Sequence, residues 1–311
     1  MSAVASLPAP VAVHPERPSQ TKLYLLIGLM TFIWALNYIV AKAVSRHMPL
    51  LTLAALRTVV AGLCVLPVFL LKGEGRWQRS DVPAMLLLGL CGVAMNQIFF
   101  VMGMGQTSVA HAAIIAALAP VQVLVLAAIR GQERLSPFKI AGLAVAFAGV
   151  GLLQISKGSA AGATPRGDLF IYLSTLLFAG FSVFGKDYTI RLGTFTMTGF
   201  AYMLSGLVML PVVVLTGQGV QWGQLPWTVW AGILYMASCS SVLAYLIFYY
   251  ALTWVPASRI AAFSYSQPIL ASLLGWLLLG ESLTMAVVGS AALVLMGVML
   301  VERGGGATQK S

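Results

Sequence analysis

Two segments of the chain repeat one pattern: Pro120-Val-Gln-Val-Leu-Val-Leu-Ala-Ala-Ile-Arg-Gly-Gln-Glu133 and Pro268-Ile-Leu-Ala-Ser-Leu-Leu-Gly-Trp-Leu-Leu-Leu-Gly-Glu281. In each segment a proline stands 13 residues before a glutamate, and an apolar run separates the two. A shift of 148 residues superimposes the segments and also places Leu135 on Leu283 and Gly149 on Gly297. Repetition at a fixed spacing indicates a duplicated unit.

A second block of matches lies nearer the N-terminus, at a shift of 144 residues, and aligns Lys42 with Lys186, Gly62 with Gly206 and Pro67 with Pro211. The two shifts differ by four residues, which a single insertion explains. Each half then holds five apolar runs. Because five is odd, the second half enters a membrane in the opposite sense to the first. We therefore predict an inverted-topology repeat, an arrangement that secondary transporters use.

The composition places the repeats in a membrane. Of the 311 residues, 59% are hydrophobic and 8% are charged, whereas soluble domains carry about 25% charged residues. A bilayer-spanning helix needs about 20 mostly apolar residues. We predict an all-α polytopic membrane protein with ten transmembrane helices, at 23–44, 50–71, 82–103, 108–129, 137–155, 168–190, 194–216, 226–250, 257–278 and 283–301.

Polar and proline-rich segments bound the two repeats. The first 22 residues hold four prolines and no apolar core of signal-peptide length, so we expect a disordered tail and no cleavage. We predict a cytoplasmic tail at 1–22, a first repeat at 23–156, a linker at 157–167, a second repeat at 168–302 and a cytoplasmic tail at 303–311.

The basic residues predict the orientation. With a cytoplasmic N-terminus, thirteen lysines and arginines fall on the inside and four on the outside, namely Lys42, Arg46, Lys157 and Arg166. Cytoplasmic loops carry the excess of lysine and arginine. We therefore expect both termini in the cytoplasm.

Four motifs resemble the EamA family of the drug/metabolite transporter superfamily: Trp34-Ala-Leu-Asn-Tyr38 with Lys42, Pro49 to Arg57, Pro120 to Glu133, and Pro268 to Glu281. The resemblance covers residues 23–302. It departs from the pattern in the second repeat, where Phe178-Ala-Gly-Phe181-Ser182 replaces the tryptophan–asparagine pair.

The resemblance implies export of amino acids or other metabolites across the bacterial inner membrane. It implies a central cavity lined by the first, third, fourth, sixth, eighth and ninth helices, with the fifth and tenth at the periphery. The nearest analogy is to YddG-type exporters of aromatic amino acids.

Polar and aromatic side chains inside the spans are the candidates for solute binding, because polar groups in lipid are costly and tend to face a cavity or a partner. The alternatives are helix–helix hydrogen bonds for the polar groups and lipid or interface packing for the aromatic ones. The candidates are Trp34, Asn37, Tyr38, Asn96, Gln97, Phe100, His111, Phe178, Phe181, Ser182, Tyr245, Tyr249, Ser264, Tyr265 and Gln267.

Five further residues stand out. Pro120 and Pro268 remove backbone donors in mid-helix, so each predicts a kink that serves gating or a static bend. Glu133 and Glu281 lie at helix ends, where we expect a structural role: accepting from the first amides of the fifth and tenth helices, or pairing with a loop base. Arg57 lies two turns into its helix and either snorkels outward or pairs with a carbonyl inside the bundle.

The positions of the carboxylates bear on whether transport is coupled to protons. All eight fall in a tail, a loop or a helix end: Glu16, Glu74, Asp81, Glu133, Asp168, Asp187, Glu281 and Glu302. Proton-coupled antiporters usually carry an ionisable relay within a span. We therefore expect a neutral, zwitterionic or aromatic solute moved by facilitated diffusion or exchange, with His111 as the only candidate titrating relay.

Other classes find less support. The chain has no HExxH, no GxSxG and no CxxC, so we expect neither an enzyme nor a metal or cofactor site. The basic residues lie in short clusters between apolar runs, which argues against a nucleic-acid-binding surface. The expected partners are a small solute and the bilayer, in a monomer or homodimer. Two alternatives stay open: a channel, and an exchanger of nucleotide sugars or phosphate esters that uses Lys42, Arg57 or Lys186 as anion partners.

Overall fold

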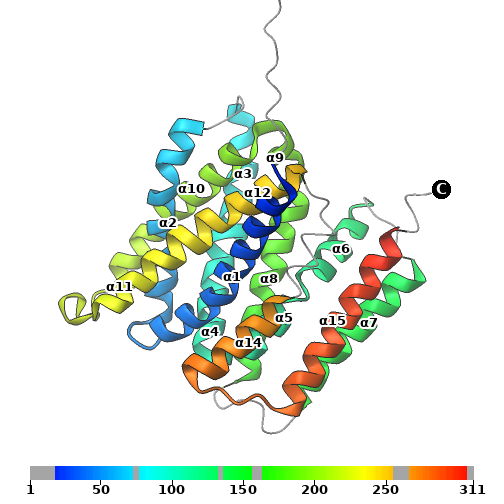
Figure 1. The fold of residues 1–311 in the computed structure, drawn as a ribbon. Helices are drawn as coiled ribbons and strands as arrows, with labels where there is room; N and C mark the ends of the chain where they lie inside the picture. The colour runs from blue at the N-terminus through cyan, green and yellow to red at the C-terminus, as the bar shows by residue number, and fades with distance from the viewer. Residues whose placement is uncertain (1–17, 73–76, 132–135, 156–162, 255–265, 307–311) are drawn as a thin grey trace, which may run out of the picture.

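The computed structural model describes residues 18–72, 77–131, 136–155, 163–254 and 266–306. Within these ranges every regular element is a helix, and the helices pack as one bundle with a two-helix unit at its edge (Figure 1).

The first repeat contains five helical segments, two of them interrupted. The segments are α1 (Gln20–Val44), α2 (Leu50–Lys72), a third formed by η1 (Arg79–Asp81), α3 (Val82–Gly89), η2 (Leu90–Met95) and α4 (Asn96–Gln106), a fourth formed by α5 (Val109–Ala116) and α6 (Ala119–Ile129), and α7 (Pro137–Ile155).

The second repeat follows the same order. Its elements are α8 (Pro165–Phe184), α9 (Lys186–Leu192), α10 (Thr194–Thr216), η3 (Trp222–Gln224), α11 (Trp227–Leu234), η4 (Tyr235–Leu243), α12 (Ala244–Trp254), α14 (Ser266–Leu279) and α15 (Met285–Gly306). Both η2 and η4 are π-helical and interrupt the third helix of their repeat, so the duplication extends to a local backbone feature.

All ten predicted apolar runs correspond to helices. Among the described residues, seven helices are long and apolar enough to cross a membrane, and three shorter apolar helices lie at 137–152, 266–279 and 285–300. This confirms the predicted all-α polytopic fold. The ninth run begins at 257, but its residues 257–265 lie outside the described part of the chain.

Two predicted boundaries differ from the structure. Helix α1 begins at Gln20, within the predicted tail, because the Ser19 hydroxyl accepts a hydrogen bond from the Lys22 amide and caps the helix. Helix α8 begins at Pro165, within the predicted linker, because Thr164 caps it in the same way. The earlier start brings Asp168 into the first turn of a packed helix.

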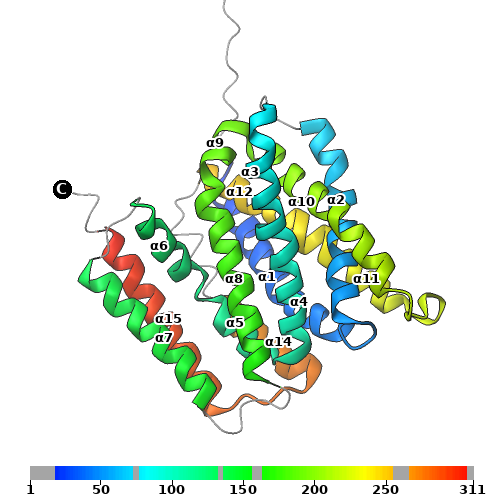
Figure 2. The ribbon, with the colours of Figure 1, turned by 180° about the vertical axis from the view of Figure 1, so that it is seen from behind.

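Helices α7 and α15 lie side by side at one edge of the bundle (Figures 1 and 2). They are the fifth helices of the two repeats, which the resemblance placed at the periphery. The first helix of each repeat packs against the fourth segment of the other, α1 on α14 and α8 on α6. The core is thus built from reciprocal contacts between the repeats.

The second helices of the repeats, α2 and α10, form an extensive contact that small residues permit. A Cβ atom on Gly62 would lie 2.9 Å from the Tyr202 carbonyl oxygen, and one on Gly206 would lie 3.3 Å from the Thr58 carbonyl oxygen. Small residues at helix contacts let backbones approach closely in membrane bundles. The glycine pair found in the repeat alignment therefore marks a packing site.

Candidate functional site

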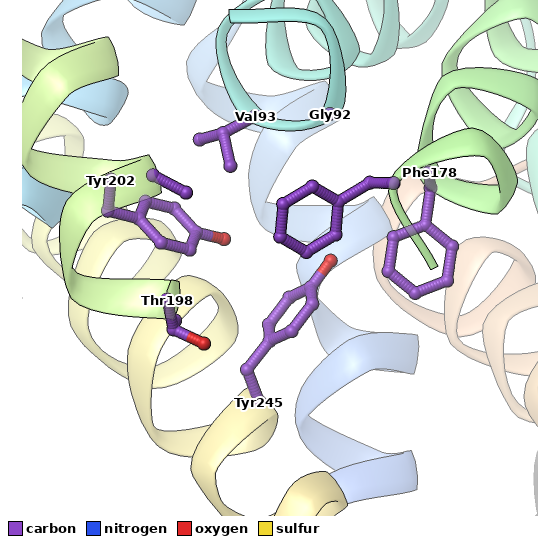
Figure 3. A pocket seen from close by; sticks show the side chains of 8 residues that line it. Gly92, Val93, Phe178, Thr198, Tyr202 and Tyr245 are labelled. Carbon is purple, nitrogen blue, oxygen red and sulfur yellow. The ribbon is translucent and has the colours of Figure 1, made fainter. Parts of the chain in front are cut away.

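A small internal cavity lies where helices of both repeats meet. Its volume is about 10 Å³, which is room for about one water molecule. Figure 3 shows the hydroxyl groups of Tyr202 and Tyr245 directed toward the same space, beside Phe178. The lining residues are Gly92, Val93, Phe178, Phe181, Thr198, Ala201, Tyr202 and Tyr245. A cavity of this size holds no molecule larger than water.

Arg57 of α2 is buried near the cavity and does not snorkel, because it is only 3% exposed. Its Nη2 donates to Ser241 Oγ at 3.2 Å and more weakly to Ser240 Oγ at 3.5 Å, both in η4. It therefore contacts hydroxyls and not the carbonyl considered from the sequence. Its Nε and Nη1 atoms have no hydrogen-bond partner among the described residues.

The π-helical backbone of η4 explains why two adjacent serines face Arg57. The Ser241 hydroxyl donates to the carbonyl of Met236, five residues earlier, at 2.9 Å. Such local widening of a helix is frequent at functional sites. The ring of Phe100 completes the surroundings of the guanidinium, whose carbon lies 5.4 Å from the ring centroid.

Two buried amide oxygens are also unsatisfied. Asn37 Oδ1 in α1 and Gln97 Oε1 in α4 have no hydrogen-bond partner among the described residues. Gln97 lies beside the hydroxyl of Tyr202, which is also within reach of Ser241 and Tyr245. Unpartnered acceptors and unpartnered donors of Arg57 therefore occur in the same central part of the bundle.

The aromatic candidates form two groups of ring contacts, one between α1 and α4 and one that links α1, α12 and α8. Tyr38 packs on Phe100 with centroids 5.6 Å apart, Trp34 packs on Tyr245 at 5.6 Å, and Phe178 packs on Tyr245 at 6.0 Å. The centre of the bundle thus has aromatic walls.

Two candidates, Trp34 and Asn96, make the helix–helix hydrogen bonds of the alternative interpretation, whereas Ser182 bonds within its own helix. Trp34 Nε1 donates to the Ser240 carbonyl at 3.3 Å, and Asn96 Nδ2 donates to the carbonyl and hydroxyl of Ser174 at 2.7 and 3.1 Å. Ser182 donates to the Phe178 carbonyl at 2.9 Å within its own helix. Asn96 in particular joins the two repeats.

Several candidates lie elsewhere. Gln267 lies in the first turn of α14 and is half-buried. Ser264, Tyr265, Glu133 and the side chain of Tyr249 lie outside the described part of the structure.

The proline predictions concern helix breaks. Residues 117 and 118 form a turn between α5 and α6, and Pro120 lies in the first turn of α6, so the span is interrupted next to the proline at which the sequence predicts a kink. Pro268 is buried in the first turn of α14. A gating role for either proline stays a prediction.

Glu281 has a structural contact, but with a different helix from the one expected. Both of its oxygens lie 2.9 Å from the amide nitrogen of Val109, and Oε2 also accepts from the Ala110 amide at 3.4 Å. It therefore caps α5 in the first repeat and not the tenth helix. Gly280, with φ of 68°, ends α14 in the left-handed conformation that glycine favours and turns the chain toward α5.

The position of Asp168 agrees with the prediction for the carboxylates, but the sequence did not predict its burial. This residue is at a helix end, as predicted, yet only 4% exposed. Its Oδ2 lies 2.9 Å from Nδ1 of His111, and its Oδ1 accepts from the Thr107 hydroxyl. The pair lies where α5 and α8 begin, apart from the residues that line the central cavity.

Sequence reasoning missed one wall of the cavity. Thr198, Ala201 and Tyr202 belong to α10, the seventh helix, which the resemblance did not place at the cavity. The hydroxyl of Tyr202 in an apolar span was the available signal, since the polar cost in lipid applies to it as to Tyr245.

Comparison with known proteins gives one consistent result. The profile of the EamA-like transporter family matches residues 21–155 and again 165–303. An uncharacterized transporter of Archaeoglobus fulgidus is 29% identical over 282 residues, which are 91% of this chain and 99% of that protein. The uncharacterized transporter YyaM of Bacillus subtilis is 28% identical, covering 88% of this chain and 91% of that protein.

Two further matches agree. The uncharacterized inner membrane transporter YedA of Escherichia coli K12 is 25% identical, and the match covers 88% of each chain. One solved crystal structure shares the fold with a TM-score of 0.65 at 19% identity, covering 94% of this chain and 100% of that one. The double match of a single profile supports the duplication read from the sequence.

Proposed function

The chain belongs to the EamA-like transporter family, and from this premise we propose that it exports small metabolites across the inner membrane by alternating access. Neutral, zwitterionic or aromatic amino acids are the first candidates for the solute. Its relatives are transporters, and the proposal adds a solute class and a mechanism to that assignment.

The two open donor nitrogens of Arg57, Nε and Nη1, carry the proposal. A buried charge without a counter-charge is costly, and a charge-assisted hydrogen bond to a carboxylate is among the stronger polar contacts in proteins. A solute carboxylate can accept a hydrogen bond from Nε or from Nη1, the two donor nitrogens that are open and point to different sides of the guanidinium.

The unsatisfied amide oxygens favour a zwitterion over a simple anion. Asn37 Oδ1 and Gln97 Oε1 can accept hydrogen bonds from an ammonium group, while Arg57 takes the carboxylate. The aromatic side chains of Tyr38, Phe178 and Tyr245 offer apolar walls for the rest of the solute.

The duplication supports alternating access. Two similar halves that pack reciprocally can close on either side of a central site with similar energy. The reciprocal contacts of α1 with α14 and of α8 with α6 are the arrangement that this mechanism needs.

The test is counterflow in proteoliposomes. Vesicles loaded with unlabelled L-phenylalanine, L-leucine or L-threonine are expected to accumulate the labelled form, which a carrier does and a channel does not. Arg57→Gln is expected to lower this flux at least about tenfold, because the free energy of one charge-assisted hydrogen bond corresponds to a factor of about that size. Arg79→Gln removes an exposed arginine and is the matched control. Amino-acid counterflow that Arg57→Gln leaves unchanged contradicts the proposal.

The same open guanidinium favours one second candidate, an exchanger of phosphate esters or nucleotide sugars. Thermal-shift measurements on the purified protein separate the two, because a ligand that binds only the folded state raises its melting temperature. Stabilisation by UDP-glucose or glucose 6-phosphate, with none by amino acids, supports the second candidate. The reverse result supports the first.

A further inference from the structure

A compact group of polar residues closes one end of the bundle, the end at which α5 and α8 begin; we call it the α5–α8 end. His111 and Asp168 form its centre, with 2% and 5% of their side chains exposed. His111 is in the first repeat and Asp168 in the second, so their contact joins the two halves. The solute site proposed above uses neither residue.

The charges around this pair are few. Lys42 of α1 donates to the Thr107 carbonyl and is attracted by Glu281, which occupies the first amides of α5. Among the described residues named here, the group holds one cation, Lys42, and two carboxylates, Asp168 and Glu281, while His111 is neutral. A proton on His111 balances the group.

The other helices packed against α5 add little charge near the pair. Helices α4 and α14 contain no acidic or basic residue. Arg46 and Arg166 lie nearby in sequence to Lys42 and Asp168, but both are exposed to solvent.

The charged residues of α7 and α15 lie far from the pair. Gly149 meets Val294 while Gly297 meets Ala146, so the two helices are antiparallel. Their charged residues Lys139, Glu302 and Arg303 therefore share the end away from Glu281.

The geometry also identifies where the proton binds. His111 Nδ1 faces the carboxylate, which stabilises the tautomer with its hydrogen on Nδ1, since the carboxylate can only accept. Nε2 then carries a lone pair that is buried and has no hydrogen-bond partner among the described residues. A proton added to the pair therefore binds at His111 Nε2.

We propose that His111 and Asp168 form a proton-binding site whose occupancy controls the opening of the α5–α8 end. Protonation turns a neutral hydrogen bond into a buried ion pair between the repeats and strengthens closure. Loss of the proton leaves excess negative charge between α5, α8 and the Glu281 turn and favours separation. A protonation state that has different free energies in the closed and open forms must shift their populations, so export is linked to protons. This replaces the uncoupled movement expected from the sequence.

The test is hydrogen exchange of the purified protein in lipid nanodiscs, which requires no knowledge of the solute. Backbone exchange in peptides spanning 107–113 and 164–171 is measured at about pH 6 and about pH 8, a range over which histidine side chains ordinarily change charge, and is corrected for the intrinsic rate. We expect several-fold stronger protection at the lower pH. His111→Gln and Asp168→Asn are each expected to abolish this difference.

His47→Gln is the matched control, because His47 is exposed in the turn after α1 and its ring lies 3.2 Å from the Ala43 carbonyl oxygen. It is expected to keep the full pH difference. Equal corrected protection of the wild-type peptides at the two pH values overturns the proposal, as does a pH difference that persists in folded His111→Gln or in Asp168→Asn. Failure of the amino-acid counterflow experiment leaves this result unaffected.

Discussion

Asn96 and Arg57 show two ways in which a polar side chain is accommodated inside an apolar bundle. The side-chain nitrogen of Asn96 donates to both the carbonyl and the hydroxyl of Ser174, and these bonds join α4 to α8. Arg57 leaves two of its nitrogens without a partner among the described residues. The first arrangement is complete without a solute, whereas the second gains from one. Whether a buried polar residue has a structural role or a binding role therefore depends on its hydrogen-bond partners and not on its residue type.

Asn96→Ala is expected to destabilise the protein without affecting solute selectivity. Interhelical hydrogen bonds in membrane proteins contribute about 0.6 kcal/mol on average, and two bonds to Ser174 are lost, so we expect a loss of about 1 kcal/mol. Reversible unfolding of the purified protein in mixed micelles measures it. Gln106→Ala is the control, because Gln106 donates to the Met102 carbonyl of its own helix. An equal loss in both variants argues against the bridging role of Asn96.

At the residue scale, the sequence could identify the polar and aromatic candidates, but it could not separate those with a structural role from those available to a solute. The spacing of Trp34, Asn37 and Tyr38 predicts a shared helix face, and the partners of Trp34 and Tyr38 do lie toward the bundle interior. Sorting needs the identity of the partner across the bundle, as for Trp34 with Ser240, 206 positions away. The burial of Asp168 likewise depends on where α8 begins. The helix starts at Pro165, three residues before the predicted start at 168.

At the element scale, Gly62→Ala is expected to force α2 and α10 apart. The new Cβ atom would lie 2.9 Å from a backbone oxygen, which cannot rotate away as a side chain can. Overpacking of this kind costs about 1–3 kcal/mol. The measurement is the melting temperature of the purified protein.

Gly28→Ala provides the comparison for this prediction. Gly28 is also in a membrane-spanning helix, but no atom lies within 4 Å of the added Cβ. Alanine is a better helix former than glycine by about 1 kcal/mol, so this variant is expected to be unchanged or slightly stabilised. Similar melting temperatures for the two variants would show that the α2–α10 contact tolerates separation.

Apolar runs predicted the helices well because lipid imposes length and composition on every span. The interruptions were less accessible. Pro120 signals the break between α5 and α6 through its missing amide. No residue pattern signals the π-helical segments η2 and η4.

For the whole molecule, polar contacts between the repeats occur at both ends of the bundle. At the α5–α8 end these are His111 and Asp168 with the Glu281 cap. At the other end Arg191 of α9 binds Asp81 of η1, with Nη1 to Oδ2 at 3.2 Å, and Arg130 binds Asp187 at 3.3 Å. Hydrogen bonds to Asp81 raise the pKa of the Arg191 guanidinium, so this contact stays charged at neutral pH. The proposed proton-binding pair lies at the α5–α8 end, so the proposal gives the two ends different sensitivities to pH.

The orientation of the repeats gives the last prediction. If the halves are inverted, the loops that follow the second helix of each repeat lie on opposite sides of the membrane. Ser80 in the first such loop and Gln221 in the second are both exposed. In a background without Cys64, Cys91 and Cys239, a membrane-impermeant maleimide is expected to label Gln221→Cys in intact cells. Ser80→Cys is expected to react only after permeabilisation, because the excess of basic residues places its loop in the cytoplasm. Labelling of both cysteines from the same side would mean parallel repeats, and reciprocal closure about a central site would then lose its structural basis.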